Sequence, residues 1–331
     1  IDIMDIYTDF FNRSELLRVL SLQPYTPGQL GALGIFQSVP LSSTIFAVEE
    51  QPKDAGRLLT AMQRGAPRQL NTQDKRKVHT FAVTDQYGDQ ASVMADEVLN
   101  ARSGITGAKD VVENRRAVQM AKLRRTMDRT HEVLRMNRLL SPASTEFGSA
   151  GSSAILAVQT DATKTRKEIF DKIIVPMESA LDGRSYTSIL VLCSDGYWSD
   201  LMDNKQIRDT YVNWEQAQLA RSGLQGENGS IAPPFPWGDV VWQRYRGTSD
   251  CKIPDNEARA IPLGVDDLAW QAFAPNTTVE SVGSGAMGQP YYVGSKPITD
   301  SQGTLGWEMS IQSHVRMVWG RPGCVLPLTK S

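Results

Sequence analysis

The stretch KDVVENRRAVQMAKLRRTMDRTHEVLRMNRLL (109–140) carries the strongest helical pattern in the sequence. Its apolar side chains recur at helical spacing and no Gly or Pro interrupts it, so we expect a rod of about 30 residues that is roughly 45 Å long. From Arg115 to Arg138 it contains eight basic and two acidic residues, a local net charge of +6. Such an excess is typical of a solvated helix face, or of a face turned toward a polyanion or a neighbouring acidic surface.

A hairpin is expected ahead of this helix. Two runs, TIFAV (44–48) and VHTFAVT (78–84), are rich in β-branched and aromatic residues and are predicted to pair as its base. The segment between them, 51–77, holds seven basic and two acidic residues, a net charge of +5. A loop of this length inside a compact domain is usually functional or disordered. Its charge fits either plain solvation or docking onto the acidic surface of another subunit, because few of its residues are apolar.

The first 40 residues are expected to form an arm that runs across something else. One short amphipathic stretch is followed by LSLQPYTPGQLGALG (20–34), whose two prolines and three glycines favour irregular backbone. Asp2, Asp5 and Asp9 stand where a signal peptide would carry Lys or Arg. No run reaches the roughly 18 apolar residues of a membrane-spanning helix. We therefore expect an intracellular, soluble chain, from which a few leading residues are missing or removed because it does not begin with Met.

The rest of the chain mixes helices and strands. A second amphipathic helix is expected to end or kink at Pro176 and to carry one apolar stripe, made of Ile169, Phe170, Ile173, Ile174, Met177 and Leu181. The apolar run TSILVLC (187–193) predicts a buried strand that leads into an aromatic-rich helix. Further strand patterns are VVWQRYRG (240–247), ARAIPLG (258–264), WEMSIQSHVRMVW (307–319) and CVLPL (324–328). Helices and strands are segregated rather than alternating, so the expected fold class is α+β.

GSGAMG (283–288) spells G-x-G-x-x-G, the fingerprint of dinucleotide-binding folds. Such a site requires a helix directly after the glycines, because the N-terminal amides of that helix hold the pyrophosphate. Pro290 and a strand-like segment follow instead, so we expect a loop that binds no nucleotide. Ser194 and Asp195 follow a buried strand, a usual place for a catalytic residue, but no histidine is placed to serve them.

No other pattern indicates catalysis. The cysteines and histidines are few and dispersed, at Cys193, Cys251, Cys324, His79, His131 and His314. We expect reduced thiols, and neither catalytic residues, nor a cofactor, nor a metal. The net charge of −2 argues against a dedicated nucleic-acid-binding protein, which is normally clearly basic.

Seven segments in order carry a family resemblance. They are RGAP (64–67), KRKVHTFAV (75–83), ADEVLNARSG (95–104), ILVLCSDGYWSDLMDNKQIRDTYVNW (189–214), FPWGDVVWQRYRG (235–247), IPDNEARAIPLGV (253–265) and AFAPNTTVESV (272–282). Together they resemble the major capsid protein E family of tailed bacteriophages, the lambda-type head proteins. The resemblance covers essentially the full chain.

The resemblance implies the HK97-like capsid fold, an α+β fold with parts that reach toward neighbouring subunits. The parts map onto this sequence as an N-terminal arm (1–40), an extended E-loop hairpin (41–88), a first peripheral part (89–182) with a spine helix at 109–140, an axial domain (183–265), and a second peripheral part (266–331).

The implied function is that of a major head protein, which is not an enzyme. It would self-assemble as hexamers and pentamers into the icosahedral shell around packaged double-stranded DNA. Implied partners are a scaffolding protein, a portal and a decoration protein, with nonspecific DNA contact and no membrane. The implied location is the virion, assembled in the bacterial cytoplasm. The candidate inter-subunit residues in the E-loop are Arg57, Arg64, Arg68, Lys75, Arg76 and Lys77. The alternatives are an encapsulin-like, non-viral shell and a nucleotide-binding enzyme that uses residues 283–288.

Overall fold

The computed structural model describes residues 11–22, 28–50, 64, 77–99, 108–144, 147–156, 162–204, 207–213, 234–278, 286–301 and 303–330. The chain divides into two compact units. The first consists of Ile1–Ile45, Ala82–Arg135 and Gln271–Met317, and the second of Phe46–Phe81, Met136–Trp270 and Val318–Ser331. The five-part organisation expected from the sequence stays a prediction, because its parts are defined by their roles in an assembled shell.

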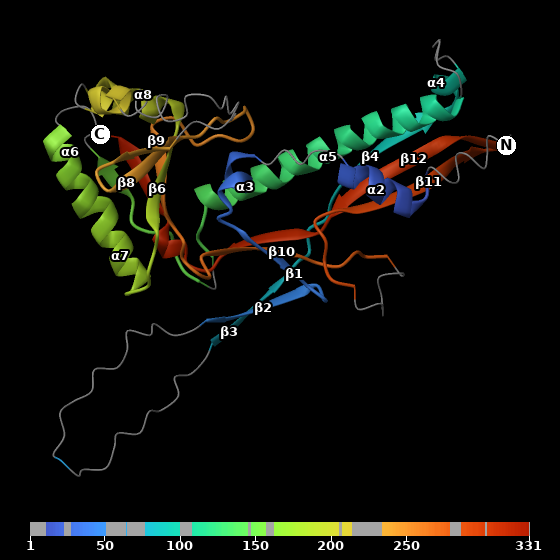
Figure 1. The fold of residues 1–331 in the computed structure, drawn as a ribbon. Coiled ribbons are helices and arrows are strands. Elements are labelled where there is room, and N and C mark those ends of the chain that lie inside the picture. The colour runs from blue at the N-terminus through green and yellow to red at the C-terminus, as the bar shows by residue number, and fades with distance from the viewer. Residues whose placement is uncertain are drawn as a thin grey trace. The chain divides into compact units, whose positions relative to one another are not determined.

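The first unit is a layer of helices on a three-stranded antiparallel sheet (Figure 1). The predicted long helix is α5 (Ala108–Leu140), and α2 (Arg13–Leu22) lies beside it on the same sheet. The sheet has the order β11 (Tyr292–Asp300), β12 (Gly303–Ser313), β4 (Tyr87–Met94).

One apolar core joins these elements. It consists of Phe11, Leu16, Val19, Leu20, Val93, Val112, Met120, Leu123, Met127, Val293, Met309 and Ile311. On β12, Met309 and Ile311 are completely buried, whereas Ser310 and Gln312 point to the opposite face, as the two-residue period of a strand requires. The sheet thus has one apolar face under the helices and one polar face.

The N-terminal segment contributes to this core. Phe11 stacks on Trp307, with ring centroids 5.5 Å apart, and Leu16 is completely buried. The sequence predicted irregular backbone through residue 34, but α3 (Gln29–Leu33) is a short helix. It ends at Gly34, whose positive φ of 64° suits glycine at the end of a helix. Long-range packing, described below, holds this helix in place.

The second unit contains a six-stranded mixed sheet. Its order is β5 (Ala154–Leu156), β14 (Leu326–Lys330), β9 (Glu257–Leu263), β6 (Ser188–Cys193), β8 (Val240–Arg244), β7 (Phe235–Trp237). The central strand β6 pairs in parallel with β8 and antiparallel with β9. The strands predicted from three separate apolar runs are therefore neighbours in one sheet.

A helical rod lies beside that sheet (Figure 1). It runs from α6 (Ala162–Ile169) through a π-helical turn, η1 (Phe170–Ile174), into α7 (Val175–Leu181). Pro176 was expected to kink or end the helix, but it lies near the start of α7. Proline has no N–H, and its ring crowds the carbonyl four residues before it, so the wider π turn directly ahead accommodates it. The π turn also rotates the side chains before it, relative to those of α7, around the helix axis. Phe170, predicted to be on the buried stripe, is 54% exposed.

Five further strands form two smaller sheets. Strands β1 (Gln37–Pro40), β10 (Ala269–Phe273) and β13 (Val315–Trp319) form a sheet in that order. Strands β2 (Ile45–Glu50) and β3 (Lys77–Ala82) pair as the predicted hairpin base. The shorter elements are helix α4 (Ala95–Leu99), helix α8 (Asp195–Asp203) and the 3-10 turn η3 (Pro322–Cys324).

Gly306→Ala is expected to lower the free energy of unfolding of the subunit by about 1–3 kcal/mol. A Cβ at this position would lie 2.5 Å from the carbonyl oxygen of Val93 on the adjacent strand β4, and a paired backbone cannot move aside. Gly88→Ala is the matched control, because its Cβ would meet nothing closer than 3.5 Å. We expect that control to stay within about 0.5 kcal/mol. Denaturant unfolding of the purified protein gives both values, and equal effects would contradict the prediction.

Candidate assembly surfaces

An aromatic cluster supports the base of the β2–β3 hairpin. Phe46 of β2 and Phe81 of β3 face each other with ring centroids 6.3 Å apart. Phe46 also meets Trp270 edge-on at 5.9 Å, and Phe81 stacks on Phe147 at 5.6 Å. Such aromatic pairs contribute about 0.5–1.5 kcal/mol beyond the burial of their area. The cluster packs one face of the hairpin against other residues of the second unit.

The other face of the hairpin is apolar and exposed. Ile45 and Val78 are each 58% exposed, and Ala47 and Thr80 are exposed as well. An isolated two-stranded hairpin has marginal stability in water unless one face is covered. In this hairpin the aromatic cluster covers one face, and apolar side chains remain exposed on the other. A surface of this kind suits contact with another protein chain.

The candidate contact residues of the E-loop fall largely outside the described residues. Arg64 is described and is exposed. Lys77 opens β3, but its side chain is not described. Arg57, Arg68, Lys75 and Arg76 lie outside the described ranges. Their role as inter-subunit contacts therefore stays a prediction.

A buried carboxylate holds the helix α3 against α5. Glu132 is 7% exposed and accepts hydrogen bonds from the backbone N–H groups of Leu30, at 2.7 Å, and Gly31, at 3.1 Å. These groups belong to the first turn of α3, where a helix has unpaired N–H donors and favours negative charge. Arg135 donates to the same carboxylate at 3.4 Å and to the side-chain oxygen of Gln271 at 3.0 and 3.2 Å.

Gly28 allows this arrangement. A Cβ at residue 28 would lie 2.1 Å from the carboxyl carbon of Glu132, so only glycine lets the backbone approach so closely. From the sequence, this glycine was interpreted as a sign of irregular backbone, and no role was predicted for Glu132. A partner about 100 residues away has no local signal.

His131 is buried beside this network and remains neutral. Its ring stacks on Tyr291 at 5.6 Å, and its Nε2 forms a hydrogen bond with the hydroxyl of Ser313 at 2.9 Å. Burial, with a smaller contribution from the nearby charge of Arg135, lowers the pKa of His131 from 6.5 to about 4. Protonation would therefore oppose the packing between α5 and β12.

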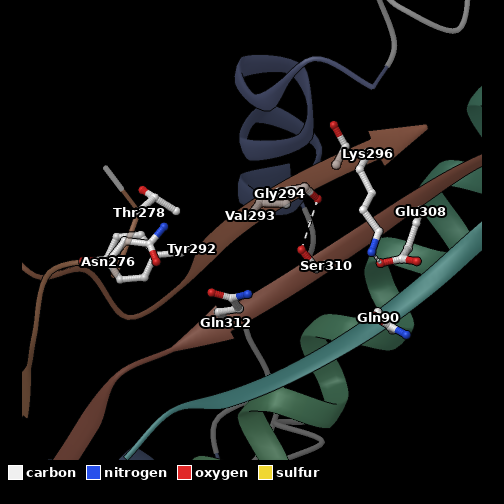
Figure 2. Close-up of a pocket in the computed structure, with 11 residues that line it drawn as sticks. Gln90, Asn276, Thr278, Tyr292, Val293, Gly294, Lys296, Glu308, Ser310 and Gln312 are labelled. Atoms are coloured by element: carbon white, nitrogen blue, oxygen red, sulfur yellow. Dashed lines mark hydrogen bonds and ion pairs between the residues drawn. The ribbon is translucent and has the colours of Figure 1, made fainter. Parts of the chain in front are cut away.

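A polar trough occupies the opposite face of the sheet β11–β12–β4 (Figure 2). It has a volume of about 360 Å³ and is lined by Gln90, Asn276, Thr278, Tyr292, Val293, Gly294, Ser295, Lys296, Glu308, Ser310 and Gln312. Lys296 and Glu308 form an ion pair at 3.1 Å, which leaves the lining without net charge. Amides and hydroxyls predominate, and the lining contains no histidine or cysteine. The trough can form hydrogen bonds with a partner, but it has no evident nucleophile–base pair.

The glycine motif at residues 283–288 has a structural role and does not form a nucleotide-binding site. Gly288 donates its backbone N–H to the carbonyl of Leu41 at 2.7 Å, and a Cβ there would lie 1.9 Å from the carbonyl oxygen of Phe273. Residues 286–291 are not helical, and β11 begins at Tyr292. The last glycine of the motif is needed for this close approach. The helix that a dinucleotide would require does not follow it.

The other candidates for chemistry also have structural roles. Ser194 is buried and caps α8, because its hydroxyl accepts the N–H of Tyr197 at 3.3 Å. Asp195 forms an ion pair with Arg244 at 2.6 Å. Among the described residues, no three His, Cys, Asp or Glu side chains gather as a metal site would require. Within the same residues, no helix combines the length and the apolar character needed to cross a membrane.

The family of the chain follows from its sequence. The family model described as phage major capsid protein E matches residues 12–330. The chain belongs to this family. It is accordingly a tailed-phage capsid protein, a structural component of the virion, and the nucleotide-binding and encapsulin-like alternatives are not favoured. No curated protein matches the chain.

Solved structures agree with this assignment at the level of the fold. A protein assigned as the capsid protein of a prophage of E. coli CFT073 is 14% identical, with 97% of this chain and 99% of that chain covered and a TM-score of 0.58. The capsid structure of cyanophage P-SCSP1u is 9% identical, with 90% and 86% covered and a TM-score of 0.51. The expected α+β, HK97-like fold is confirmed.

Acidification is expected to destabilise the subunit through His131. Between about pH 6.5 and pH 4 the unfolded chain binds a proton at this residue and the folded chain does not, so stability present above pH 6.5 is lost as the pH falls. The full difference corresponds to about 3 kcal/mol. His131→Gln keeps a hydrogen-bonding group and removes the titration. Denaturant unfolding of both proteins at neutral and acidic pH tests this, and identical pH dependence would contradict it.

Proposed function

We propose that copies of this chain close into an icosahedral shell, as hexamers and pentamers, around packaged double-stranded DNA. The match of the phage major capsid protein E family to residues 12–330 supports this most directly. The exposed apolar face of the β2–β3 hairpin supports it further, because it is a surface that an isolated subunit leaves uncovered.

We propose that the E-loop is the segment that contacts the adjacent subunit. Its base is fixed by the aromatic cluster around Phe46 and Phe81, so docking its outer part requires less ordering than docking a free tail would. The segment 51–77 has a net charge of +5, and we assign its Arg57, Arg64, Arg68, Lys75, Arg76 and Lys77 to carboxylates of the adjacent subunit. Each such contact exists only when the neighbour is present, so closure of the shell is cooperative.

Further partners follow from the proposed role in assembly. A scaffolding protein and a portal take part while the shell forms in the cytoplasm of the bacterial host, and a decoration protein is a candidate for the outer surface. The packaged DNA touches the inner surface without sequence preference, through basic side chains and phosphates.

Charge reversal in the E-loop tests the proposal. In Arg57→Glu/Arg68→Glu, each attraction to a neighbouring carboxylate becomes repulsion. A loss of about 1.4 kcal/mol per contact corresponds to a tenfold change in association, so we expect the yield of closed shells to fall at least about tenfold. The assay is sedimentation and electron microscopy of protein expressed together with the other head proteins of its phage.

The matched control is Lys167→Glu/Arg208→Glu. Both positions are exposed and lie in the second unit, and the total charge changes equally. The control should assemble like the unchanged protein. Full shell yield from the E-loop variant would refute the docking role. A failure of the unchanged protein to form shells under any condition would refute the proposed function itself.

A further inference from the structure

The polar face of the sheet β11–β12–β4 is hollowed where small residues meet. The strand register aligns residues in rows across the sheet, and one row consists of Gly294, Ser310 and Gln90. On β11, Tyr292 lies in the row before it and Lys296 in the row after it. Gly294 has no side chain, and a Cβ there would already lie 3.0 Å from the hydroxyl oxygen of Ser310. The trough, with its volume of about 360 Å³, therefore depends on glycine at this position.

One wall of the trough is held in place by hydrogen bonds within the first unit. Tyr292 donates its hydroxyl to the carbonyl of Ala274 at 3.0 Å and accepts the N–H of Gln289 at 2.8 Å. Ala274 donates its own N–H to the carbonyl of His314 at 3.0 Å. These contacts position the segment that carries Asn276, which lines the trough. A ligand would therefore bind without the cost of ordering this wall.

Two glutamine amides of the lining are free to bind a ligand. Gln90 comes from β4 and Gln312 from β12 (Figure 2). Within the described part of the chain, neither side-chain amide forms a hydrogen bond. Each offers an acceptor oxygen and two N–H donors. The side-chain oxygen of Asn276 accepts the N–H of Thr277 at 2.9 Å, so its NH₂ group remains as a donor. The trough thus presents donors and acceptors side by side.

The lining residues exclude several classes of partner. Lys296 and Glu308, the charged residues among them, pair with each other at 3.1 Å, so the trough has no net charge with which to attract phosphate or nucleic acid. A protein partner is usually anchored by an aromatic or aliphatic side chain in an apolar pocket. The side chain of Val293, however, belongs to the core on the other face of the sheet, and Tyr292 is only 8% exposed.

We propose that the trough binds a neutral saccharide chain. A hydroxyl group is both a donor and an acceptor, so the hydroxyls of a sugar match side-chain amides that offer both functions. The trough binds the saccharide without cleaving it, because glycoside hydrolysis generally uses two carboxylates and Glu308 is the one carboxylate among the lining residues. This binding goes beyond the proposed function and does not require a closed shell.

Saturation-transfer NMR on the purified full-length protein measures this binding directly. The neutral probes are maltohexaose, cellohexaose, mannohexaose and N-acetylchitohexaose, and hexagalacturonate is the anionic probe of equal length. We expect at least one neutral probe to bind with a dissociation constant on the order of 1 mM, and hexagalacturonate to bind more weakly. The affinity for the neutral probe should stay constant from about 50 mM to about 500 mM salt, because screening acts on charged partners.

Two variants locate the site. Gln90→Ala/Gln312→Ala removes both free amides, and since a net hydrogen bond contributes a factor of about five to an equilibrium constant, we expect the affinity to fall at least about tenfold. Gly294→Thr keeps both amides but fills the hollow beside Ser310, and should abolish binding. The matched control, Asn114→Ala/Gln119→Ala, removes two amides from α5 in the same unit and should keep the affinity within about twofold.

Three results would overturn the proposal. They are the absence of binding by every neutral probe, tighter binding of hexagalacturonate, and unchanged affinity in the glutamine double variant. Thermal unfolding of each variant shows whether it is folded, and if Gly294→Thr is not, the glutamine variant at the surface of the sheet decides. Failure to form shells would refute the proposed function but would not alter any of these binding results.

Discussion

The contact between the apolar face of α5 and the sheet β11–β12–β4 is the interaction on which the first unit depends. Each completely buried side chain in it, such as Met120 or Met309, contributes about 2 kcal/mol relative to exposure. The same contact sets the rotation of the helix about its own axis. Once the apolar side is fixed, Asp128 and Glu132 are buried, whereas Arg115, Lys122 and Arg125 are exposed to solvent.

In the second unit, an aromatic cluster supports the paired strands β2 and β3. The rings of Phe46 and Phe81 are held between Phe147 and Trp270, which come from segments more than 100 residues apart. The hairpin therefore begins from a fixed base. Gly320 fits the same region closely, because a Cβ there would lie 2.5 Å from the ring of Trp270.

Local patterns predicted much of the fold. The uninterrupted periodicity of residues 109–140 correctly predicted α5, and the apolar run at 187–193 correctly predicted β6. In both cases the residue pattern that indicates the structure lies within the element itself. The helix α3, the π turn before Pro176 and the exposure of Phe170 were missed, since each depends on a distant partner or on a change of helical pitch. The carboxylate of Glu132 and the neutral ring of His131 were missed for the same reason. The E-loop basic residues were predicted from charge and remain untested by the fold.

The clamp of Glu132 on α3 bears on how truncations of this protein should be interpreted. Removing the first 34 residues would take away the donors of Leu30 and Gly31, leave a buried carboxylate with fewer partners, and expose core positions beside Trp307. The fold of the first unit would then be destabilised in the shortened chain. Loss of assembly after this deletion would therefore report the unfolding of the subunit. It would not show that the segment contacts a neighbouring subunit.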